Sequence, residues 1–563
     1  MDANDIKATD NIKIIRFQKH LEIGDFHYQK KDIDSALKNY FSALKIDKTS
    51  NILLQNTFYL FCTTKISNLN KKTMKEICLF FLNEQNIRHQ LCFRNSLKLT
   101  TFHKNKDYNE KKLDKCNKLN DKLISILEDK VLQQILRKCL LVDFDLEIFL
   151  TQIRKNLLEN YLSKKKNSIK KIYKFLICFA EQCFLSDYIF KSSKKEEKLL
   201  SRIEQSLYKK RIINEYDVLL ISLYKPIGSL KYLNNQLSSY NSKSKDFNNF
   251  LKFTFRNPKY EHLLGNKIKE ISKIENKKSV LIKNQYEANP YPRWRNINLP
   301  EKIDISDFIY QNTNNNINLG LEKKKILIAG CGTGQQIFGY SGINDVDIFA
   351  IDISKTSLAF AKRMTDKHKI HNIKYFQMDL LNIDLLKESF DIIICSGCLH
   401  HMEKPFEGLQ SLYKVLKPDG FMKLGLYSTI ARSSIIDLRN YIKRSDLKFN
   451  KQNIFRIREM IVNSNNDEIK KLSQTPDFYS TSSFRDLIFN RVEHTFDLIE
   501  IKNEILKQNL RFLGFDLYSN HLQKFKACYP DHNSELDLEN WYKFEIKFPK
   551  TFVSMYNFWV SKI

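Results

Sequence analysis

A glycine-rich turn at residues 330–334 is the feature whose residue types and spacing most clearly suggest chemistry. The stretch ILIAGCGTGQQ, residues 326–336, places Gly330, Gly332 and Gly334 within five positions, although the chain of 563 residues has only 14 glycines. An apolar run precedes the turn and a helical pattern follows it. In such a strand–turn–helix context, glycines let a ligand approach the main chain closely. We therefore predict a ligand-binding site at this turn.

Acidic residues at the ends of the next two predicted strands could complete such a site. Asp352 ends the strand VDIFAIDIS and can accept hydrogen bonds from both hydroxyls of a ribose. Asp379 ends the strand in IKYFQMDLLNI, where it can meet an adenine amino group. The glycine spacing is G-x-G-x-G rather than G-x-G-x-x-G, and no phosphate-binding lysine follows. The pattern therefore favours a neutral or cationic adenosyl ligand over a pyrophosphate.

Five motifs then follow one another in an order typical of one enzyme family. They are ILIAGCGTG, the acidic Asp352, MD at 378–379, FDIIICSGCLHH at 390–401 and VLKPDG at 415–420. Together they closely resemble the class I S-adenosylmethionine-dependent methyltransferases. The resemblance implies S-adenosyl-L-methionine as cofactor and an α/β Rossmann-like domain with a mostly parallel seven-stranded sheet. The cofactor-binding residues that it implies are Gly330, Cys331, Gly332, Gly334, Asp352, Ile353, Asp379, Leu380 and Ser396.

A wider resemblance covers most of the chain. NQYEANPYPRW at 284–294, DFYSTSSFRDLIFNRVEHTF at 477–496 and FPKTFVSMYNFWVSK at 548–562 are similar to a group of bacterial proteins. In that group, tetratricopeptide-type (TPR) helices are joined to such a methyltransferase domain. The resemblance names the cofactor but does not name the acceptor of the methyl group.

The elements that must carry these residues divide into three predicted parts. Residues 1–50 are predicted to form a TPR-like helical hairpin, because Gly24, Ala36, Tyr40 and Ala43 have the spacing that lets two helices cross closely; a generic helical hairpin is the alternative. Residues 51–280 show helical periodicity with few Pro or Gly, which predicts an all-helical domain.

Residues 281–563 alternate apolar strands with amphipathic helices, which predicts the methyltransferase domain. A segment at about 430–496 is predicted to be an insertion that caps the sheet. Residues 510–519 are predicted to contain the sixth strand. MYNFWVSKI at 555–563 fits either an antiparallel seventh strand or a closing helix.

Methyl transfer is an in-line displacement at a sulfonium, so it needs positioning and sometimes a base but no metal or covalent residue. His400 and His401 follow the fourth predicted strand and are weak candidates for a base, with loop structure as the alternative. Tyr427 follows the fifth strand and is a third weak candidate. Cys395 and Cys398 form a lone C-x-x-C inside a strand motif, which favours core packing over zinc.

Two groups of residues are candidates for contacts with the acceptor. The first lies in a proline-stiffened segment that either covers the cofactor as a lid or packs as a simple linker: Tyr286, Tyr291, Arg293 and Trp294. The second belongs to the predicted cap and the end of the fifth strand: Arg432, Arg485 and His494.

The charge of the chain is unevenly distributed. The formal net charge is +29, but residues 1–300 hold 57 Lys and Arg against 32 Asp and Glu, whereas residues 301–563 hold 36 against 32. No apolar run is long enough to span a membrane, the N-terminus lacks a signal-peptide pattern, and the 11 cysteines are scattered. We therefore expect a cytoplasmic protein with no membrane span.

Three functions remain open. The leading hypothesis is an active methyltransferase whose acceptor is a protein side chain, a small metabolite or a glycan precursor, and whose helical half binds a protein partner or the acceptor. The second makes RNA the acceptor and uses the basic half to contact phosphates, although no RNA-binding motif is present. The third is a non-catalytic interaction scaffold that senses the cofactor.

Overall fold

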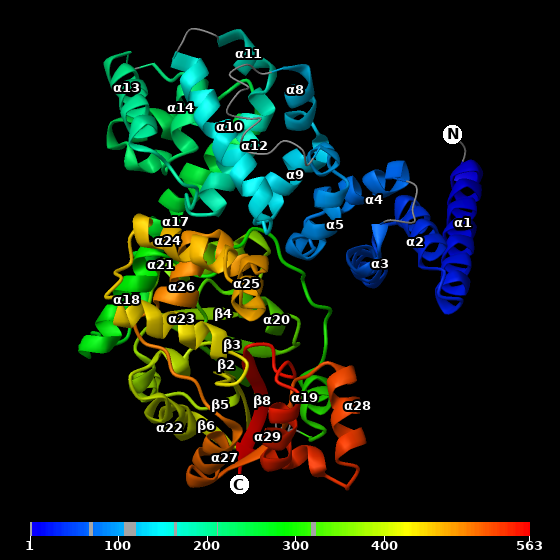
Figure 1. Cartoon of the computed structure of the whole chain (residues 1–563). Helices are drawn as coiled ribbons and strands as arrows, with labels where there is room; N and C mark the ends of the chain where they lie inside the picture. Colours follow the sequence, from blue (N-terminus) through cyan, green and yellow to red (C-terminus); the bar gives the residue numbers. More distant parts are fainter. Residues whose placement is uncertain (1–2, 67–70, 106–119, 163–165, 211, 317–321) are drawn as a thin grey trace. The chain divides into compact units, whose positions relative to one another are not determined.

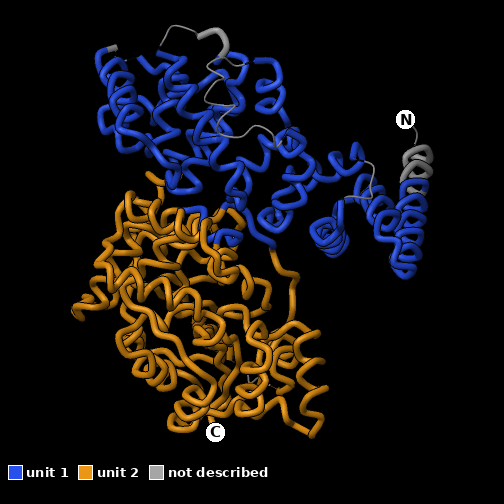
Figure 2. The backbone as a smooth tube through the Cα atoms, in the orientation of Figure 1, with its two compact units in different colours: residues 1–256, 295–298, 473–480 blue, residues 257–294, 299–472, 481–563 orange. Residues whose placement is uncertain are grey.

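The computed structural model describes residues 3–66, 71–105, 120–162, 166–210, 212–316 and 322–563, which divide into two compact units. Figure 1 shows the elements and Figure 2 the two units. The helical unit comprises residues 1–256, 295–298 and 473–480, and the sheet unit comprises 257–294, 299–472 and 481–563. The predicted boundary of the methyltransferase domain was residue 281. The sheet unit also includes residues 257–280, and eight residues of the predicted cap, 473–480, group with the helical unit.

The helical unit consists of amphipathic helices around one apolar core. Its helices of ten or more residues are α1 (Ala3–Gln29), α2 (Ile33–Ile46), α3 (Asn51–Thr63), α4 (Lys71–Asn83), α10 (Phe144–Leu162), α12 (Tyr173–Leu185) and α13 (Lys194–Lys210). Shorter helices include α5 (Phe93–Lys98), α8 (Asp121–Leu127), α9 (Lys130–Lys138), α14 (Glu215–Ser222), α15 (Asn234–Ser239) and α16 (Lys245–Leu251). Among the residues described above, every helix is too short or too polar to span a membrane.

Helices α1 and α2 form the hairpin that the spacing of small residues predicts. A side chain at Gly24 would place its Cβ 2.6 Å from Cε1 of Tyr40, so glycine is required where the two helices cross. The Tyr40 hydroxyl donates a hydrogen bond of 2.7 Å to Asp25. The hairpin is therefore explained by close packing, and its assignment as a TPR stays a prediction.

The helical unit contains an ionic cluster around a buried carboxylate. Glu181 on α12 is 0% exposed. Arg137 donates two hydrogen bonds of 3.1 Å to its carboxylate and one of 3.0 Å to Asp246. Arg295 donates a further hydrogen bond of 2.6 Å to Glu181. We call Glu181, Arg137, Arg295 and Asp246 the Glu181 cluster. Its two arginines and two carboxylates balance one another.

The sheet unit is built on one mixed sheet of eight described strands in the order β1-β4-β3-β2-β5-β6-β8-β7. They are β1 (Lys269–Glu270), β2 (Lys324–Ala329), β3 (Val346–Asp352), β4 (Ile373–Gln377), β5 (Phe390–Ser396), β6 (Leu416–Tyr427), β7 (Leu510–Phe515) and β8 (Met555–Lys562). Strands β1 to β6 pair in parallel, and β8 pairs antiparallel with β6 and β7.

The sheet order shows both the number of described strands and the form of the C-terminal segment. The predicted sheet had seven strands, and the structure has one more because the two-residue β1 pairs with the edge strand β4. The C-terminal segment, for which a strand and a helix were both open, is the antiparallel strand β8, placed between β6 and β7.

Alternating residues of the central strands face two separate apolar cores, as the two-residue period of a strand requires. Ile326 and Ile328 of β2 belong to one core, whereas Leu327 and Ala329 belong to the other. The first core includes residues of α19 (Ile305–Thr313), α20 (Gln335–Tyr340) and α21 (Lys355–Lys367). The second includes residues of α22 (Pro405–Val415), α27 (Leu498–Lys507) and α29 (Leu538–Lys547). Helices therefore cover both faces of the sheet.

The remaining helices of this unit flank the strands. They are α17 (Asn257–Gly265), α18 (Lys277–Ala288), α23 (Ser433–Arg444), α24 (Lys451–Val462), α25 (Asp467–Lys471), α26 (Thr481–Phe489) and α28 (Ser519–Cys528). The strand order reverses at β2, with β3 on one side and β5 on the other. In open parallel sheets, such a switch point creates a crevice at the carboxyl ends of the strands.

Candidate active site

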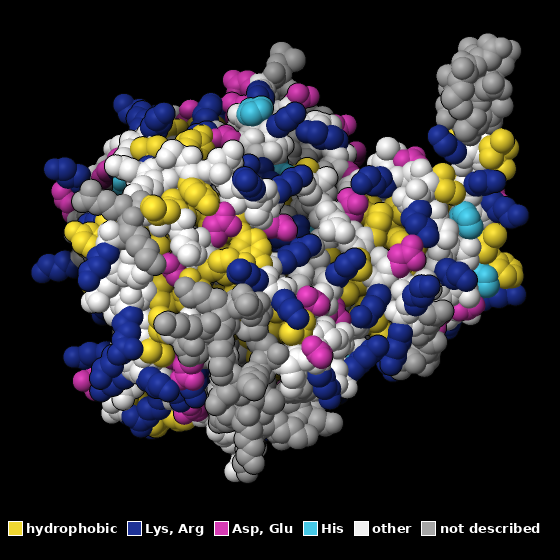
Figure 3. All heavy atoms as spheres, turned by 90° about the horizontal axis from the view of Figure 1, so that it is seen from above, with side chains coloured by type: hydrophobic (Ala, Val, Ile, Leu, Met, Phe, Trp, Pro, Cys, Tyr) yellow, Lys and Arg dark blue, Asp and Glu magenta, His cyan; other side chains and the backbone are white. Residues whose placement is uncertain are grey.

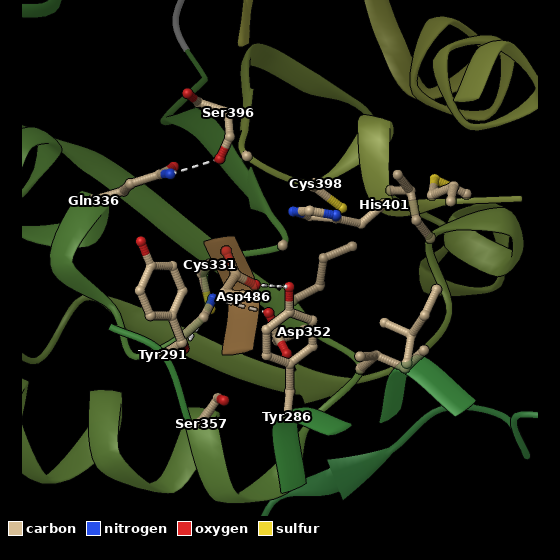
Figure 4. Close-up of a pocket in the computed structure, with 18 of the residues that line it drawn as sticks. Tyr286, Tyr291, Cys331, Gln336, Asp352, Ser357, Ser396, Cys398, His401 and Asp486 are labelled. Carbon is tan, nitrogen blue, oxygen red and sulfur yellow. Dashed lines mark hydrogen bonds between the residues drawn. The ribbon is translucent and has the colours of Figure 1, made fainter. Parts of the chain in front are cut away.

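A cavity of about 390 Å³ lies at this switch point. Residues from the carboxyl ends of β2, β3, β5 and β6 and from the loop after β4 line it. Helices α18, α20, α21 and α26, the segment after α18, the loop after β5 and the start of β8 contribute further lining residues. Figure 4 shows the labelled lining residues pointing into the same space.

The glycine turn adopts a backbone that other residues rarely take. Gly330, Gly332 and Gly334 have φ angles of 67°, 52° and 82°. A Cβ at Gly330 would lie 2.6 Å from the Cβ of Cys398, and one at Gly334 would lie 2.6 Å from the Cβ of Ala361. The glycines are therefore required by neighbouring parts of the chain as well as by left-handed backbone. Gly334 is the N-cap residue of α20 and does not line the cavity, whereas Gly330 and Gly332 do.

Asp352 at the end of β3 is fixed by the glycine turn. Its carboxylate accepts hydrogen bonds from the backbone N–H groups of Gly332, at 2.8 Å, and of Ser354, at 2.9 Å. Burial raises the pKa of this carboxyl to about 6, against the effect of the two backbone donors, which lower it. Each carboxylate oxygen accepts one of these bonds and keeps a second lone pair for a ligand.

Two further predicted positions lie along the same wall. Asp379, which is 6% exposed, follows β4 and accepts a hydrogen bond of 3.1 Å from the backbone of Leu381. Ser396 ends β5, and its carbonyl accepts a hydrogen bond of 2.7 Å from the side chain of Gln336 (Figure 4). Ile353 and Leu380 complete the apolar lining beside Asp352 and Asp379.

A polar cluster forms another part of the lining. The Tyr286 hydroxyl on α18 donates a hydrogen bond of 2.7 Å to Asp486 on α26, as Figure 4 shows. Asn490 donates to the same carboxylate oxygen at 3.0 Å. Burial, reinforced by the charge of Asp486, holds the pKa of Tyr286 well above its usual range, so the phenol stays protonated. We call Asp486, Tyr286, Asn490 and His401 the Asp486 cluster.

His401 belongs to this cluster through its Nδ1 atom. That nitrogen lies 2.9 Å from the carbonyl oxygen of Val492 and 3.2 Å from the side-chain nitrogen of Asn490. The carbonyl contact is the shorter one, and a carbonyl can only accept. Nδ1 therefore carries the hydrogen in the neutral ring, and Nε2 is left as an acceptor. Figure 4 shows the ring of His401 pointing into the cavity.

The structure separates the predicted site residues into two groups. Those that line the cavity are Gly330, Cys331, Gly332, Asp352, Ile353, Asp379, Leu380, Ser396, Tyr286, Tyr291, His401 and Tyr427. Those outside its lining are Gly334, His400, Arg293, Trp294, Arg432, Arg485 and His494.

The residues outside the lining have packing roles instead. The ring of Tyr427 is stacked by His400 and by the guanidinium of Arg432, each 3.6 Å from its centroid. Burial lowers the pKa of His400 well below its usual value, so this ring stays neutral. Arg432 is itself paired with Glu493 at 2.9 Å. These side chains orient Tyr427 rather than reach the cavity.

Trp294 packs beneath the glycine turn rather than over the cavity. Its indole N–H donates to the Thr333 carbonyl at 3.2 Å, and its ring meets Phe338 and Phe360 edge-on. Arg485 donates a hydrogen bond of 2.8 Å to Asn289, and the backbone of His494 donates to the His400 carbonyl at 2.8 Å. Within the proline-stiffened segment, Tyr291 lines the cavity and Trp294 packs.

Sequence reasoning missed several lining residues. The most important is Asp486, next to the predicted Arg485; the others include Gln336, Ser357, Cys398, Met402 and Met555. Adjacent helical residues point about 100° apart, so only the packing of α26 decides whether position 485 or 486 faces the cavity. The stretch SSFRDLIF places the carboxylate of Asp486 on the apolar side of a helix, which is a detectable signal. Nothing in the sequence indicates that this carboxylate contacts Tyr286.

Three features define an α/β domain that can bind an adenosyl ligand. They are the sheet order, the crevice at its switch point, and the glycine turn beside a strand that ends in an acidic residue. Residues 326–420 match the family model described as a methyltransferase domain. An uncharacterized protein of Synechococcus sp. is 36% identical over 124 residues, which are 22% of this chain and 30% of that protein. The ubiquinone biosynthesis O-methyltransferase of Glaesserella parasuis is 30% identical over 124 residues, covering 21% of this chain and 51% of the relative.

A similar solved structure is that of PKMT2 from Rickettsia typhi, with 19% identity and a TM-score of 0.35, covering 46% of this chain and 51% of that chain. The chain spans about half or less of the length of these curated relatives. The sheet unit contains a class I methyltransferase domain, and S-adenosyl-L-methionine is the cofactor of that domain.

Proposed function

We propose that this chain transfers a methyl group from S-adenosyl-L-methionine to an acceptor that enters the cavity beside the Asp486 cluster. The observation that carries the proposal is the single cavity that joins the glycine turn and Asp352 to a second set of polar side chains. One end suits an adenosyl compound, and the other offers groups that can hold and deprotonate a nucleophile.

The glycine turn, Asp352 and Asp379 each bind a different part of the cofactor. The main chain of Gly330 and Gly332 leaves room for the methionine portion, Asp352 accepts from the ribose hydroxyls, and Asp379 accepts from the adenine amino group. When bound, the cofactor supplies an activated methyl group on a sulfonium. Tyr286 and Tyr291 help to keep water from the reacting atoms, and Tyr427 is held rigidly by its two stacking partners.

The acceptor class follows the three possibilities given above: a protein side chain, a small metabolite or a glycan precursor. We assign the helical unit the task of binding a partner protein or the acceptor. A groove of about 1100 Å³ on α1, α2 and α3 supports this assignment, since Tyr28, Ile52 and Tyr59 on it are each more than half exposed.

RNA as acceptor is less well supported. Figure 3 shows Lys and Arg side chains scattered over one face, with acidic and apolar side chains between them. On that face the described cations do not gather into one tract that would follow a phosphate backbone. A non-catalytic scaffold is also less well supported, because hydrogen bonds hold the polar side chains of the cavity in place.

Incubation of the chain with a cell extract and S-adenosylmethionine labelled in its methyl group tests the proposal. Label should move to a protein band, a small soluble product or a glycan precursor, and an Asp352→Ala variant should transfer far less. Transfer to RNA would favour the second hypothesis. Absence of any transfer, with the cofactor still bound, would favour the scaffold and contradict the proposed activity.

A further inference from the structure

The charge of the cavity lining is one-sided. Among the described residues that line it, three are aspartates, namely Asp352, Asp379 and Asp486, and none is Lys or Arg. Asp352 and Asp379 stand where the ribose and the adenine are expected. Asp486 is the carboxylate that the cofactor's sugar and base do not use. A lining of this kind repels anionic acceptors and attracts cations.

Asp486 is buried without a compensating cation. It is 5% exposed, and no Lys, Arg or His of the described chain forms an ion pair with it. Its hydrogen-bond donors are the neutral Tyr286 hydroxyl and Asn490 amide, and both reach the oxygen Oδ1. A buried carboxylate without a counter-charge is unfavourable unless a cation pairs with it. The adjacent Arg485 donates its hydrogen bond to Asn289 instead, and Arg432 stacks on Tyr427 and is already paired with Glu493.

The cavity that Asp486 lines suits a compact organic cation. The rings of Tyr286 and Tyr291 line the cavity, and aromatic faces attract ammonium groups. Met402 and Met555 add polarizable apolar surface for an alkyl chain. Figure 4 shows Asp486, Tyr286 and the ring of His401 converging on one part of the cavity.

An ammonium group must lose a proton before its nitrogen can attack a methyl group, and the same cluster holds a proton acceptor. With Nδ1 of His401 donating to the Val492 carbonyl, Nε2 keeps a free lone pair on the cavity side. The carboxylate of Asp486 can therefore bind the amine as a cation, and the imidazole of His401 can remove its proton.

We propose that the acceptor is an alkyl amine, which enters as an ammonium ion paired with Asp486 and gives up its proton to Nε2 of His401. This inference rests on the proposed function and names the substrate class of the same site. The nitrogen lone pair then forms a bond to the methyl carbon while the carbon–sulfur bond breaks and its electron pair stays on sulfur. His401 afterwards releases its proton to solvent.

The sulfonium of the cofactor is the rival cation for Asp486, and one comparison separates the two. S-Adenosylhomocysteine lacks the sulfonium charge but is otherwise the same ligand. If Asp486 pairs with the acceptor, the Asp486→Asn variant binds S-adenosylmethionine and S-adenosylhomocysteine as tightly as the unaltered chain does. Loss of affinity for S-adenosylmethionine alone would assign the carboxylate to the sulfonium and overturn the amine proposal.

The direct test uses the full chain saturated with S-adenosylhomocysteine. n-Butylammonium chloride and n-butanol, equal in length but different in charge, are titrated separately, and binding is followed by saturation-transfer NMR. We expect butylammonium to bind more tightly than butanol. Asp486→Asn should weaken butylammonium binding by about tenfold or more, as expected for the loss of a charged hydrogen-bonding partner. The matched control is Asp437→Asn, which removes an exposed carboxylate on α23 and should change neither affinity.

Three results would overturn the amine proposal: no butylammonium binding, equal affinity for butanol and butylammonium, or undiminished butylammonium binding by Asp486→Asn. Failure of the proposed function has a different signature. In that case the unaltered chain, saturated with labelled S-adenosylmethionine, would transfer no methyl group to any component of the cell extract, whatever its affinity for butylammonium.

Discussion

The two buried polar clusters of this protein differ in how completely their charges are matched. In the Glu181 cluster, both carboxylate oxygens accept hydrogen bonds from arginines. In the Asp486 cluster, the donors are uncharged and one side faces a cavity. We infer that a polar cluster whose charges are balanced within the chain stabilises the fold. A cluster that lacks a counter-charge is instead balanced by a bound ligand. The predictions below test this distinction.

The largest expected effect is on the Glu181 cluster. Glu181→Ala would leave the guanidinium groups of Arg137 and Arg295 buried without their main partner. Breaking a buried ion pair in this way lowers the free energy of unfolding by about 3–5 kcal/mol. Chemical denaturation followed by circular dichroism measures the change. A loss below about 1 kcal/mol, the range of an exposed ion pair, would show that the cluster is not closed as described.

The next effect concerns the cofactor end of the cavity. Asp352→Ala should weaken S-adenosylhomocysteine binding by about 2–3 kcal/mol, because charge-assisted hydrogen bonds from the ribose are lost. Isothermal titration calorimetry gives the affinity, with Asp437→Asn as the control. Unchanged affinity in the Asp352→Ala variant would contradict the placement of the ribose against this carboxylate.

A pH dependence of binding should follow from the same residue. The pKa of Asp352 is raised to about 6, so the carboxyl is ionised above that pH and protonated below it. A protonated carboxyl accepts fewer hydrogen bonds, so affinity for S-adenosylhomocysteine should fall as pH drops below about 6, by up to about tenfold per pH unit. Titrations between neutral pH and pH 5 check the slope. Asp352→Asn should abolish it, and an equal slope in both proteins would exclude Asp352 as its source.

The smallest expected effect is on the stability of the Asp486 cluster. Asp486→Asn removes a charge that no described cation balances and keeps a side chain that accepts from Tyr286. The free energy of unfolding should change by less than about 1 kcal/mol, in contrast to the change at Glu181. The same denaturation experiment measures it. A loss as large as that of Glu181→Ala would mean that Asp486 is a structural residue and would remove the contrast between the clusters.

Local sequence patterns were enough to predict that the glycine turn and Asp352 meet. The turn at 330–334 and Asp352 are separated by one helix and one strand, and this spacing predicts that they lie in contact. The hydrogen bond between Gly332 and Asp352 confirms the contact. The parallel order of the central strands also follows from alternating strand and helix patterns. Two-residue β1 has no detectable periodicity, and the pattern of β8 fitted a strand and a helix equally.

The Asp486 cluster, where we propose that the acceptor binds, could not be found in the same way. Tyr286 and Asp486 lie 200 positions apart and meet only because α18 and α26 pack around the same cavity. The predicted candidates Arg432 and Arg485 were chosen for their charge near strand ends, but their side chains pair with Glu493 and Asn289 instead. Charge and position along the chain therefore do not reveal the direction of a side chain on a packed helix.

The central claim is that the cavity at the switch point holds the adenosyl cofactor, and a crystal structure of the chain grown with S-adenosylhomocysteine tests it most directly. We predict adenosyl density in that cavity, with both ribose hydroxyls within hydrogen-bonding distance of Asp352 and the amino acid portion along Gly330 and Gly332. A cavity that stays empty at saturating ligand, or a ligand bound elsewhere, would contradict the account.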